Sequence, residues 1–398
     1  MAMSHIPVYH QPFAISECKA RLDRIQKRMS EQDLHALLVT IPENIYYVSG
    51  YRSAGHGVAP IHVLIVPREG EPRILARVLE RETVLRFSWT RDPVFYRDFE
   101  DPFVALRRVI GEMGLSEPKR IGLEMGSWYM PARTCEKLRA TFATTEFRDC
   151  TGLIEEFRMV KSQQELEYMR KSAKLTEIGL TKGIEATEVG AHEYEVAAEI
   201  LHAMYKNGQD DSMSTWFSVN SGPSGGCGHD SYRDKIIEKN DLVYIEVTGC
   251  HHLYMTNGIV AIYMGRAPSK LREIHEVTVR LHNECVRACK PGVTGEEVWS
   301  VADRINRAAG LGEYGRRIGV SLGLSAQPNY FVSEGYDLIK GEKRPLKAGM
   351  ILSIEPGTGA FGIGTEKIPV GTVVGSDIII TENGNEQLVA PMVELIEK

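Results

Sequence analysis

The sequence lacks three features that mark large classes of protein. No apolar run approaches the roughly 20 residues that a transmembrane helix needs. Basic residues give no excess, since 47 Lys and Arg stand against 53 Asp and Glu, and this excludes the positive footprint typical of nucleic-acid binding. Residues 1–12 lack the basic-then-apolar pattern of a secretory signal. We therefore expect a cytoplasmic protein with a small-molecule substrate, bound neither to nucleic acid nor to a membrane.

Cysteine is also sparse. The seven cysteines are an odd number, they are scattered, and no two form a CxxC pair. This favours free thiols in a reducing compartment over a disulfide framework. Cys227 and Cys250 with nearby histidines are the one zinc alternative, but the ligand spacing typical of zinc sites is missing.

What the sequence does contain is enough for two globular domains. It has 398 residues, of which 43% are hydrophobic and 25% charged, values ordinary for a folded protein. Residues 16–32 have the spacing of an amphipathic helix. Strand-like runs follow at 36–40, 62–67 and 120–124, with helical segments between them. The pattern predicts an α/β domain over residues 1–158.

The second domain, 159–398, is predicted to be α+β. It opens with a capping box at Ser162 and Glu165. Helical patterns follow the capping box, and again over 269–309. Two strand-rich blocks lie at 242–264 and 350–381.

Several segments in this half resemble one family in the order that the family has them. They are RMVKSQQE at 158–165, SVNSGPSGGCGH at 218–229, KNDLVYIE at 239–246, KPGVT at 290–294, LKAGMILSIEPG at 346–357 and DIIITENG at 377–384. The family is that of the "pita-bread" proteins, which includes methionine and proline aminopeptidases, prolidase, creatinase and ectoine hydrolase. The resemblance implies a pita-bread catalytic domain preceded by a creatinase-type N-terminal domain.

The peptidases of this family hold two metal ions with Asp, Asp, His, Glu and Glu. By resemblance, these positions fall here on Glu246, Asn257, Val320, Glu355 and Gly375. Valine and glycine offer no side-chain ligand, and two cations need charged oxygen and nitrogen ligands. The departures predict a protein with no metal and no other cofactor.

The resemblance implies a catalytic role for His229, as general acid and base, and for Glu246 and Glu355. Without metal ions, the two glutamates would favour a planar organic cation. The prediction is therefore a metal-independent hydrolase that cleaves a C–N bond of a guanidino or cyclic amidine compound, similar to creatinase or ectoine hydrolase. A Xaa-Pro metallopeptidase of the aminopeptidase P or prolidase type is the alternative. A non-catalytic binding module is a further one.

Four residues are predicted to bind substrate: Arg52, Trp216, His252 and Asn257. Arg52 lies in a loop at 51–58, Trp216 precedes the His229 segment, and His252 lies beside His251 in the strand-rich block at 242–264. Creatinase-like relatives are homodimers in which the N-terminal domain reaches the partner's active site. The resemblance therefore implies a homodimer here, with the 51–58 loop lining the other subunit's pocket.

Overall fold

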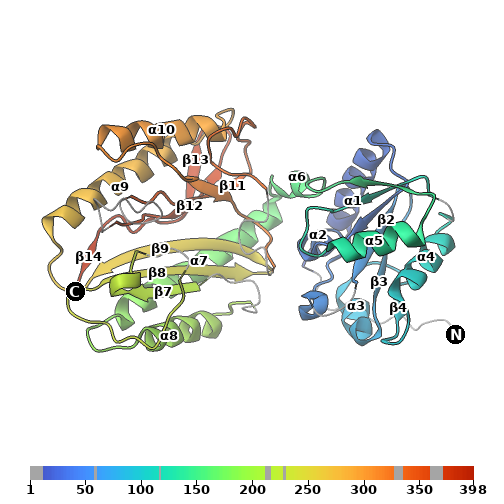
Figure 1. Ribbon diagram of the computed structural model, residues 1–398, viewed down its shortest axis with the longest axis horizontal. Helices are drawn as coiled ribbons and strands as arrows, with labels where there is room; N and C mark the ends of the chain where they lie inside the picture. The colour runs from blue at the N-terminus through green and yellow to red at the C-terminus, as the bar shows by residue number, and fades with distance from the viewer. Residues whose placement is uncertain are drawn as a thin grey trace. The chain divides into compact units, whose positions relative to one another are not determined.

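Two units make up the chain, unit 1 over residues 1–158 and unit 2 over 159–398. The computed structural model describes residues 12–57, 61–115, 118–210, 217–226, 230–326, 335–358 and 371–398. Figure 1 labels the helices and strands of both units. Within the described ranges, no helix is both long enough and apolar enough to cross a bilayer.

Unit 1 is built on one six-stranded sheet with the order β4-β3-β2-β1-β5-β6. Its central strand β1 pairs antiparallel with β2 and parallel with β5. The strands are β1 (Ala36–Val39), β2 (Val63–Pro67), β3 (Arg73–Arg77), β4 (Val94–Tyr96), β5 (Arg120–Leu123) and β6 (Glu146–Asp149).

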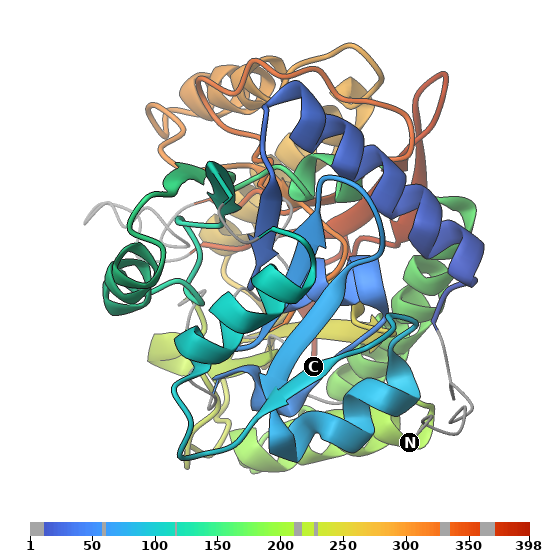
Figure 2. The ribbon, with the colours of Figure 1, turned by 90° about the vertical axis from the view of Figure 1, so that its right-hand side faces the viewer.

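Helices cover both faces of this sheet. Figure 2 shows α1 on one side and α4 and α5 on the other. The helices, including short 3-10 turns, are α1 (Ile15–Glu31), α2 (Pro42–Ser49), η1 (Ala54–Gly57), η2 (Val78–Glu80), α3 (Arg81–Phe87), α4 (Pro102–Glu112), α5 (Ala132–Thr141) and α6 (Glu155–Arg158). Leu106, Val109 and Leu138 from α4 and α5 join Ala36 and Leu38 of β1 in one buried core. The predicted α/β class of the first domain is confirmed.

Unit 2 contains two four-stranded sheets, ordered β10-β11-β12-β13 and β14-β9-β8-β7. Apart from the short β14, their pairings are antiparallel. The strands are β7 (Phe217–Ser221), β8 (Leu242–His251), β9 (Tyr254–Tyr263), β10 (Gly319–Ser321), β11 (Ile351–Ile354), β12 (Ser376–Ile380), β13 (Asn385–Val389) and β14 (Ile396–Glu397). A 3-10 turn, η4 (Gly222–Ser224), follows β7.

Each sheet of unit 2 has a pair of helices on its outer face. Figure 1 shows α9 and α10 above the sheet of β11, β12 and β13, and α7 and α8 below the sheet of β8 and β9. The helices are α7 (Gln163–Ala186), α8 (Glu193–Lys206), α9 (Ser269–Ala288) and α10 (Gly295–Ala308). Separate apolar cores lie between each helix pair and its sheet. The inner faces of the two sheets are therefore left to face one another, and the α+β prediction is confirmed.

The start of α7 follows the predicted capping box. Glu165 N–H donates to Ser162 Oγ, and the Glu165 carboxylate accepts from Ser162 N–H at 2.8 Å. Thr294 and Glu297 repeat the arrangement at α10. These reciprocal bonds satisfy backbone donors that the first turn of a helix leaves unpaired.

Candidate active site

Strands β8 and β9 carry one half of a buried polar cluster. Glu246 pairs across the hairpin with Ile259, and Thr248 pairs with Asn257. Paired residues of antiparallel strands share a face, and side chains alternate along each strand. Glu246, Asn257 and Ile259 therefore point away from the α7–α8 core, which takes the intervening residues Ile245, Val247 and Val260.

The opposite sheet carries the other half. Val320, Ser353 and Asp377 pair in one row across β10, β11 and β12. Glu355 directly follows β11, two residues beyond Ser353. Asp377 Oδ2 accepts a 2.6 Å hydrogen bond from the backbone N–H of Asn257. This bond joins the inner faces of the two sheets.

Hydrogen bonds tie these residues into one group. Asn257 Nδ2 donates to Glu246 Oε1 at 2.9 Å and more weakly to Glu355 Oε2 at 3.4 Å. The Tyr244 hydroxyl donates to Glu246 Oε2 at 2.6 Å. Tyr244, Glu246, Asn257, Glu355 and Asp377 are all buried. We call these five residues the carboxyl–amide cluster.

Burial controls the charge of this cluster. Desolvation and the nearby charge of Glu246 raise the pKa of Glu355 to about 7, although Arg316 and Arg317 oppose the shift. Desolvation also holds the pKa of Asp377 well above its usual range. A carboxyl group with a pKa near neutrality can both hold and release a proton at physiological pH.

The cluster does not fit the two metal ions that the family's peptidases hold. Val320 is buried but has no donor atom, and Gly375 has no side chain. Asn257 turns its N–H group, not its oxygen, toward the carboxylates. Within the described ranges, no three His, Cys, Asp or Glu side chains are arranged to hold a metal ion. We therefore derive no catalytic step from a metal.

The predicted site residues fall into three groups. Glu246, Glu355 and Asn257 meet in the cluster, as described. His229 and Trp216 lie outside the described residues, so their roles stay predictions. Arg52 lies half-buried in unit 1, just before η1, and its role also stays a prediction.

His252 is not in the cluster. It lies in the β8–β9 turn with a φ of 52°, and its ring packs 4.6 Å from that of Tyr168 on α7. Glu246 and His251 are five residues apart on β8, about 16 Å at the rise of an extended strand. A substrate-binding role for His252 at the cluster would need a ligand that reaches the far end of the hairpin.

Two members of the cluster, Tyr244 and Asp377, are not predicted from the sequence. Both follow from the two-residue period of a strand. Tyr244 lies two residues before Glu246 on the same face, and Asp377 lies two residues after Gly375. Applying that period to Glu246 would have identified Tyr244, whereas for Asp377 it gives the face of the strand but not the contact with Asn257.

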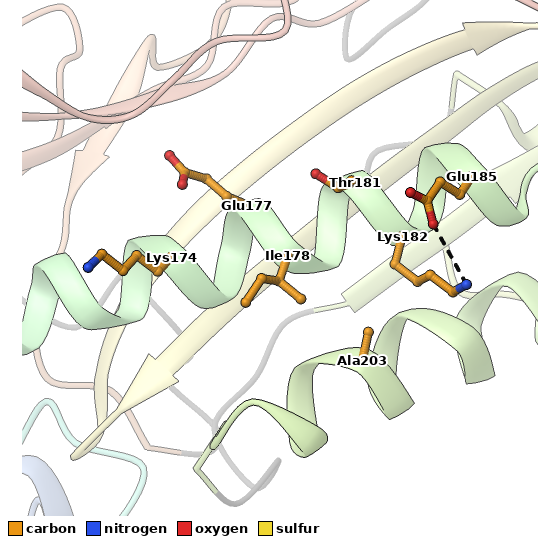
Figure 3. Close-up of a pocket in the computed structure, with 7 residues that line it drawn as sticks. All are labelled: Lys174, Glu177, Ile178, Thr181, Lys182, Glu185 and Ala203. Carbon is orange, nitrogen blue, oxygen red and sulfur yellow. Dashed lines mark ion pairs between the residues drawn. The ribbon is translucent and has the colours of Figure 1, made fainter.

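A surface groove of about 490 Å³ is separate from the cluster. Figure 3 shows it along α7 beside α8. Its lining residues are Lys174, Glu177, Ile178, Thr181, Lys182, Glu185 and Ala203. It lies on the outer helices, whereas the cluster lies between the sheets. Its Lys182 already pairs with Glu185 and Glu199, so the groove has the character of a solvated helix surface.

Similar proteins include several that cleave Xaa-Pro bonds. The chain is 27% identical to the Xaa-Pro dipeptidase of Pyrococcus furiosus over 380 residues, covering 95% of this chain and 100% of that protein. The prolidase of Pyrococcus horikoshii matches with a TM-score of 0.81 and 26% identity, over 95% of this chain and 100% of the other. An X-Pro aminopeptidase from Thermotoga maritima has the same fold, with a TM-score of 0.80 at 20% identity, over 95% and 99% of the two chains.

These relatives overturn the predicted function. A hydrolase of guanidino or cyclic amidine compounds, similar to creatinase or ectoine hydrolase, was expected from the missing ligands; the relatives are Xaa-Pro dipeptidases instead. The prediction was wrong because it inferred a substrate from what the cluster lacks. The relatives do not support the label metal-independent either, since the family is one of metallopeptidases.

The fold prediction, in contrast, is confirmed. A pattern for the creatinase/prolidase N-terminal domain matches residues 21–160. A pattern for metallopeptidase family M24 matches residues 167–382, which is more than half of the chain. Together with the pita-bread architecture of the prolidase structures, these matches show that this chain belongs to metallopeptidase family M24, a family of hydrolases.

Proposed function

We propose that this protein is a peptidase of the Xaa-Pro type that acts on dipeptides at the carboxyl–amide cluster. The observation that carries the proposal is the end-to-end similarity to Xaa-Pro dipeptidases, at 26–27% identity over 95% of the chain. A similarity that spans both units supports a shared substrate class better than a match to the catalytic domain alone. The substrate is then a small molecule; a homodimer and a cytoplasmic location remain predictions.

The cluster offers groups that can move a proton. Glu355, whose pKa burial raises to about 7, can give a proton to the departing amine or take one from an attacking water. Tyr244 and Asn257 hold the two oxygens of Glu246, so that this carboxylate keeps one orientation. His229 is proposed as a further acid and base, from the family resemblance.

Two cations stand beside the acidic groups. Arg316 Nη2 donates to the backbone oxygen of Glu355 at 3.2 Å, and Arg317 lies 3.4 Å from Asp337. Both lower the pKa of Glu355 through their charge. A Xaa-Pro dipeptide carries a carboxylate at one end and an ammonium at the other. The arginines complement the carboxylate and the glutamates complement the ammonium.

One observation favours a second candidate, a protein that binds the dipeptide without cleaving it. Val320 and Gly375 supply no donor at two positions where the family's peptidases hold metal. The charge complementarity described above serves binding as well as hydrolysis.

Kinetics with matched dipeptides test the proposal. We expect the purified protein to cleave a Xaa-Pro dipeptide and to leave the corresponding Xaa-Ala dipeptide intact. Glu246→Gln and Glu355→Gln should each slow the cleavage by about 100-fold or more, and Glu177→Gln, the same change in the surface groove, should not slow it. Calorimetric binding of the dipeptide without release of proline would favour the binding protein. A protein that neither binds nor cleaves the dipeptide would contradict both candidates.

A further inference from the structure

We infer that the side-chain amide of Asn257 stands in place of the family's two-metal centre, so that this chain gathers its carboxyl groups around N–H and O–H donors instead of metal ions. The inference concerns the metal content of the protein and is independent of the substrate proposed above. It rests on which atoms face one another inside the carboxyl–amide cluster.

The side-chain amide of Asn257 turns its NH₂ group toward two glutamates. Asn257 lies between Glu246 and Glu355, and both carboxylates are hydrogen-bond acceptors. The group within 2.9 Å and 3.4 Å of them must therefore be the NH₂ group. An amide NH₂ group does not coordinate a cation, because its nitrogen lone pair is delocalised into the carbonyl and the group acts only as a donor. The amide oxygen has no hydrogen-bond partner among the described residues.

Each oxygen of Glu246 already accepts a hydrogen bond. Its Oε1 accepts from Asn257 and its Oε2 accepts from Tyr244. Both donors come from the hairpin that carries Glu246 itself. A metal ion at this carboxylate would therefore have to share its oxygens with two donors that already occupy them in a buried site.

Gly375 stands at the position of the family's last metal-binding glutamate. A Cβ atom built there would lie 2.9 Å from Cδ1 and 3.2 Å from Cγ1 of Ile259. Ile259 packs with Tyr244 and Val373 in a small apolar cluster. The space that a glutamate side chain would need is thus filled by a hydrocarbon side chain from the facing strand.

Asp377, the remaining carboxyl group of the cluster, is tied to the backbone of the facing sheet. Its Oδ2 is held at 2.6 Å by the backbone N–H of Asn257. It is paired with Ser353, in the same row as Val320. Asp377 therefore links the two sheets. Its neighbour in the row, Val320, has no ligand atom, and Asp377 does not form a metal-binding group with Glu246 and Glu355.

Metal binding measured on the whole protein tests the inference. The protein is stripped with a chelator, incubated with Mn²⁺, Co²⁺ or Zn²⁺, desalted and analysed for bound metal, and its Tm is recorded with and without each ion. We expect no stoichiometric metal and no upward shift of the Tm. One or two equivalents of metal that disappear in the Glu246→Gln/Glu355→Gln double variant would overturn the inference. Metal that the double variant retains equally lies elsewhere and leaves it standing.

Asn257→Asp is the matched gain-of-binding variant. It replaces the bridging NH₂ group with an oxygen, so that a third carboxylate lies between Glu246 and Glu355. We expect a lower Tm than that of the wild type without metal, and a rise of several degrees when Mn²⁺ is added. If Asn257→Asp does not fold, the metal content of the wild type still decides the question. A wild type that Mn²⁺ stabilises as much as the variant would contradict the replacement.

Discussion

Two buried glutamates, Glu124 in unit 1 and Glu355 in unit 2, have opposite surroundings. In unit 1, Glu124 Oε2 accepts from Thr40 N–H at 2.6 Å and from Ile41 N–H at 2.8 Å. Its Oε1 accepts from Asn44 Nδ2 at 2.7 Å. In unit 2, the Glu355 carboxylate accepts one bond among the described residues, at 3.4 Å from Asn257.

Burial raises the pKa of both groups, to about 8 for Glu124, with the help of Glu155, and to about 7 for Glu355. A raised pKa therefore does not distinguish a functional carboxyl group from a structural one. Hydrogen bonding does, because Glu124 is committed to the backbone that starts α2, whereas Glu355 keeps acceptor capacity for a ligand.

The largest expected effect is a loss of turnover when Glu355 is replaced. Glu355→Gln should lower the turnover of a Xaa-Pro dipeptide by about 10²–10⁴-fold, the usual worth of a general acid or base. Its Tm should not fall, since the change removes a buried charge and few bonds. Steady-state kinetics and thermal unfolding on one preparation measure both. A lower Tm with unchanged turnover would make Glu355 structural.

The next effect concerns the structural side. Glu124→Leu removes the acceptor of four buried donors, namely the N–H and the hydroxyl of Thr40, the N–H of Ile41 and the amide of Asn44. It should destabilise unit 1 by roughly 3–5 kcal/mol, measured by urea unfolding. Glu124→Gln keeps acceptor capacity on its amide oxygen and should cost less. Equal stability of all three proteins would refute the structural role.

Acid should stabilise both units. Each glutamate has a pKa in the folded state above its ordinary value of 4.5. Its contribution to stability is therefore fully present below about pH 4.5 and is lost as the pH rises through about 7 or 8. From pH 5 to pH 8, the unfolding free energy of the wild type should fall by roughly 2 kcal/mol more than that of Glu355→Gln. Identical pH profiles of the two proteins would contradict a protonated Glu355.

The smallest effect concerns the phenol that holds Glu246. Tyr244→Phe removes one 2.6 Å hydrogen bond and keeps the ring in its apolar cluster. It should cost about 1 kcal/mol of stability. If the bond orients Glu246 for catalysis, kcat should fall while KM stays constant. A fall in stability with no change in kcat would limit Tyr244 to a packing role.

The sequence predicts local features of both units well. The helix at 16–32 and the capping box of α7 depend on neighbouring residues, and both are found. Glu246 and Asn257 are 11 residues apart on one hairpin, so they too are within reach of a pattern. Asp377 is 120 residues from Asn257 along the chain. Its contact depends on how two sheets face each other, which no local period reveals.

The function was less predictable for a physical reason. Missing ligands say what a site no longer binds, but the substrate depends on the shape and charge of the whole site. The cluster contains hydrogen-bond donors as well as acids, because Tyr244 and Asn257 donate to Glu246. These donors already stabilise a carboxylate that a cationic substrate was expected to stabilise. Two buried glutamates alone therefore did not specify a guanidinium ligand.

Calorimetric titration of a Xaa-Pro dipeptide into the chelator-treated protein tests most directly whether the carboxyl–amide cluster is the functional site. The account predicts that the wild type and Glu177→Gln bind the dipeptide equally, and that Glu246→Gln/Glu355→Gln binds it at least about tenfold more weakly, a loss of about 1.4 kcal/mol or more. Equal affinity in all three proteins would contradict the account, because the dipeptide would then bind somewhere other than at these two glutamates.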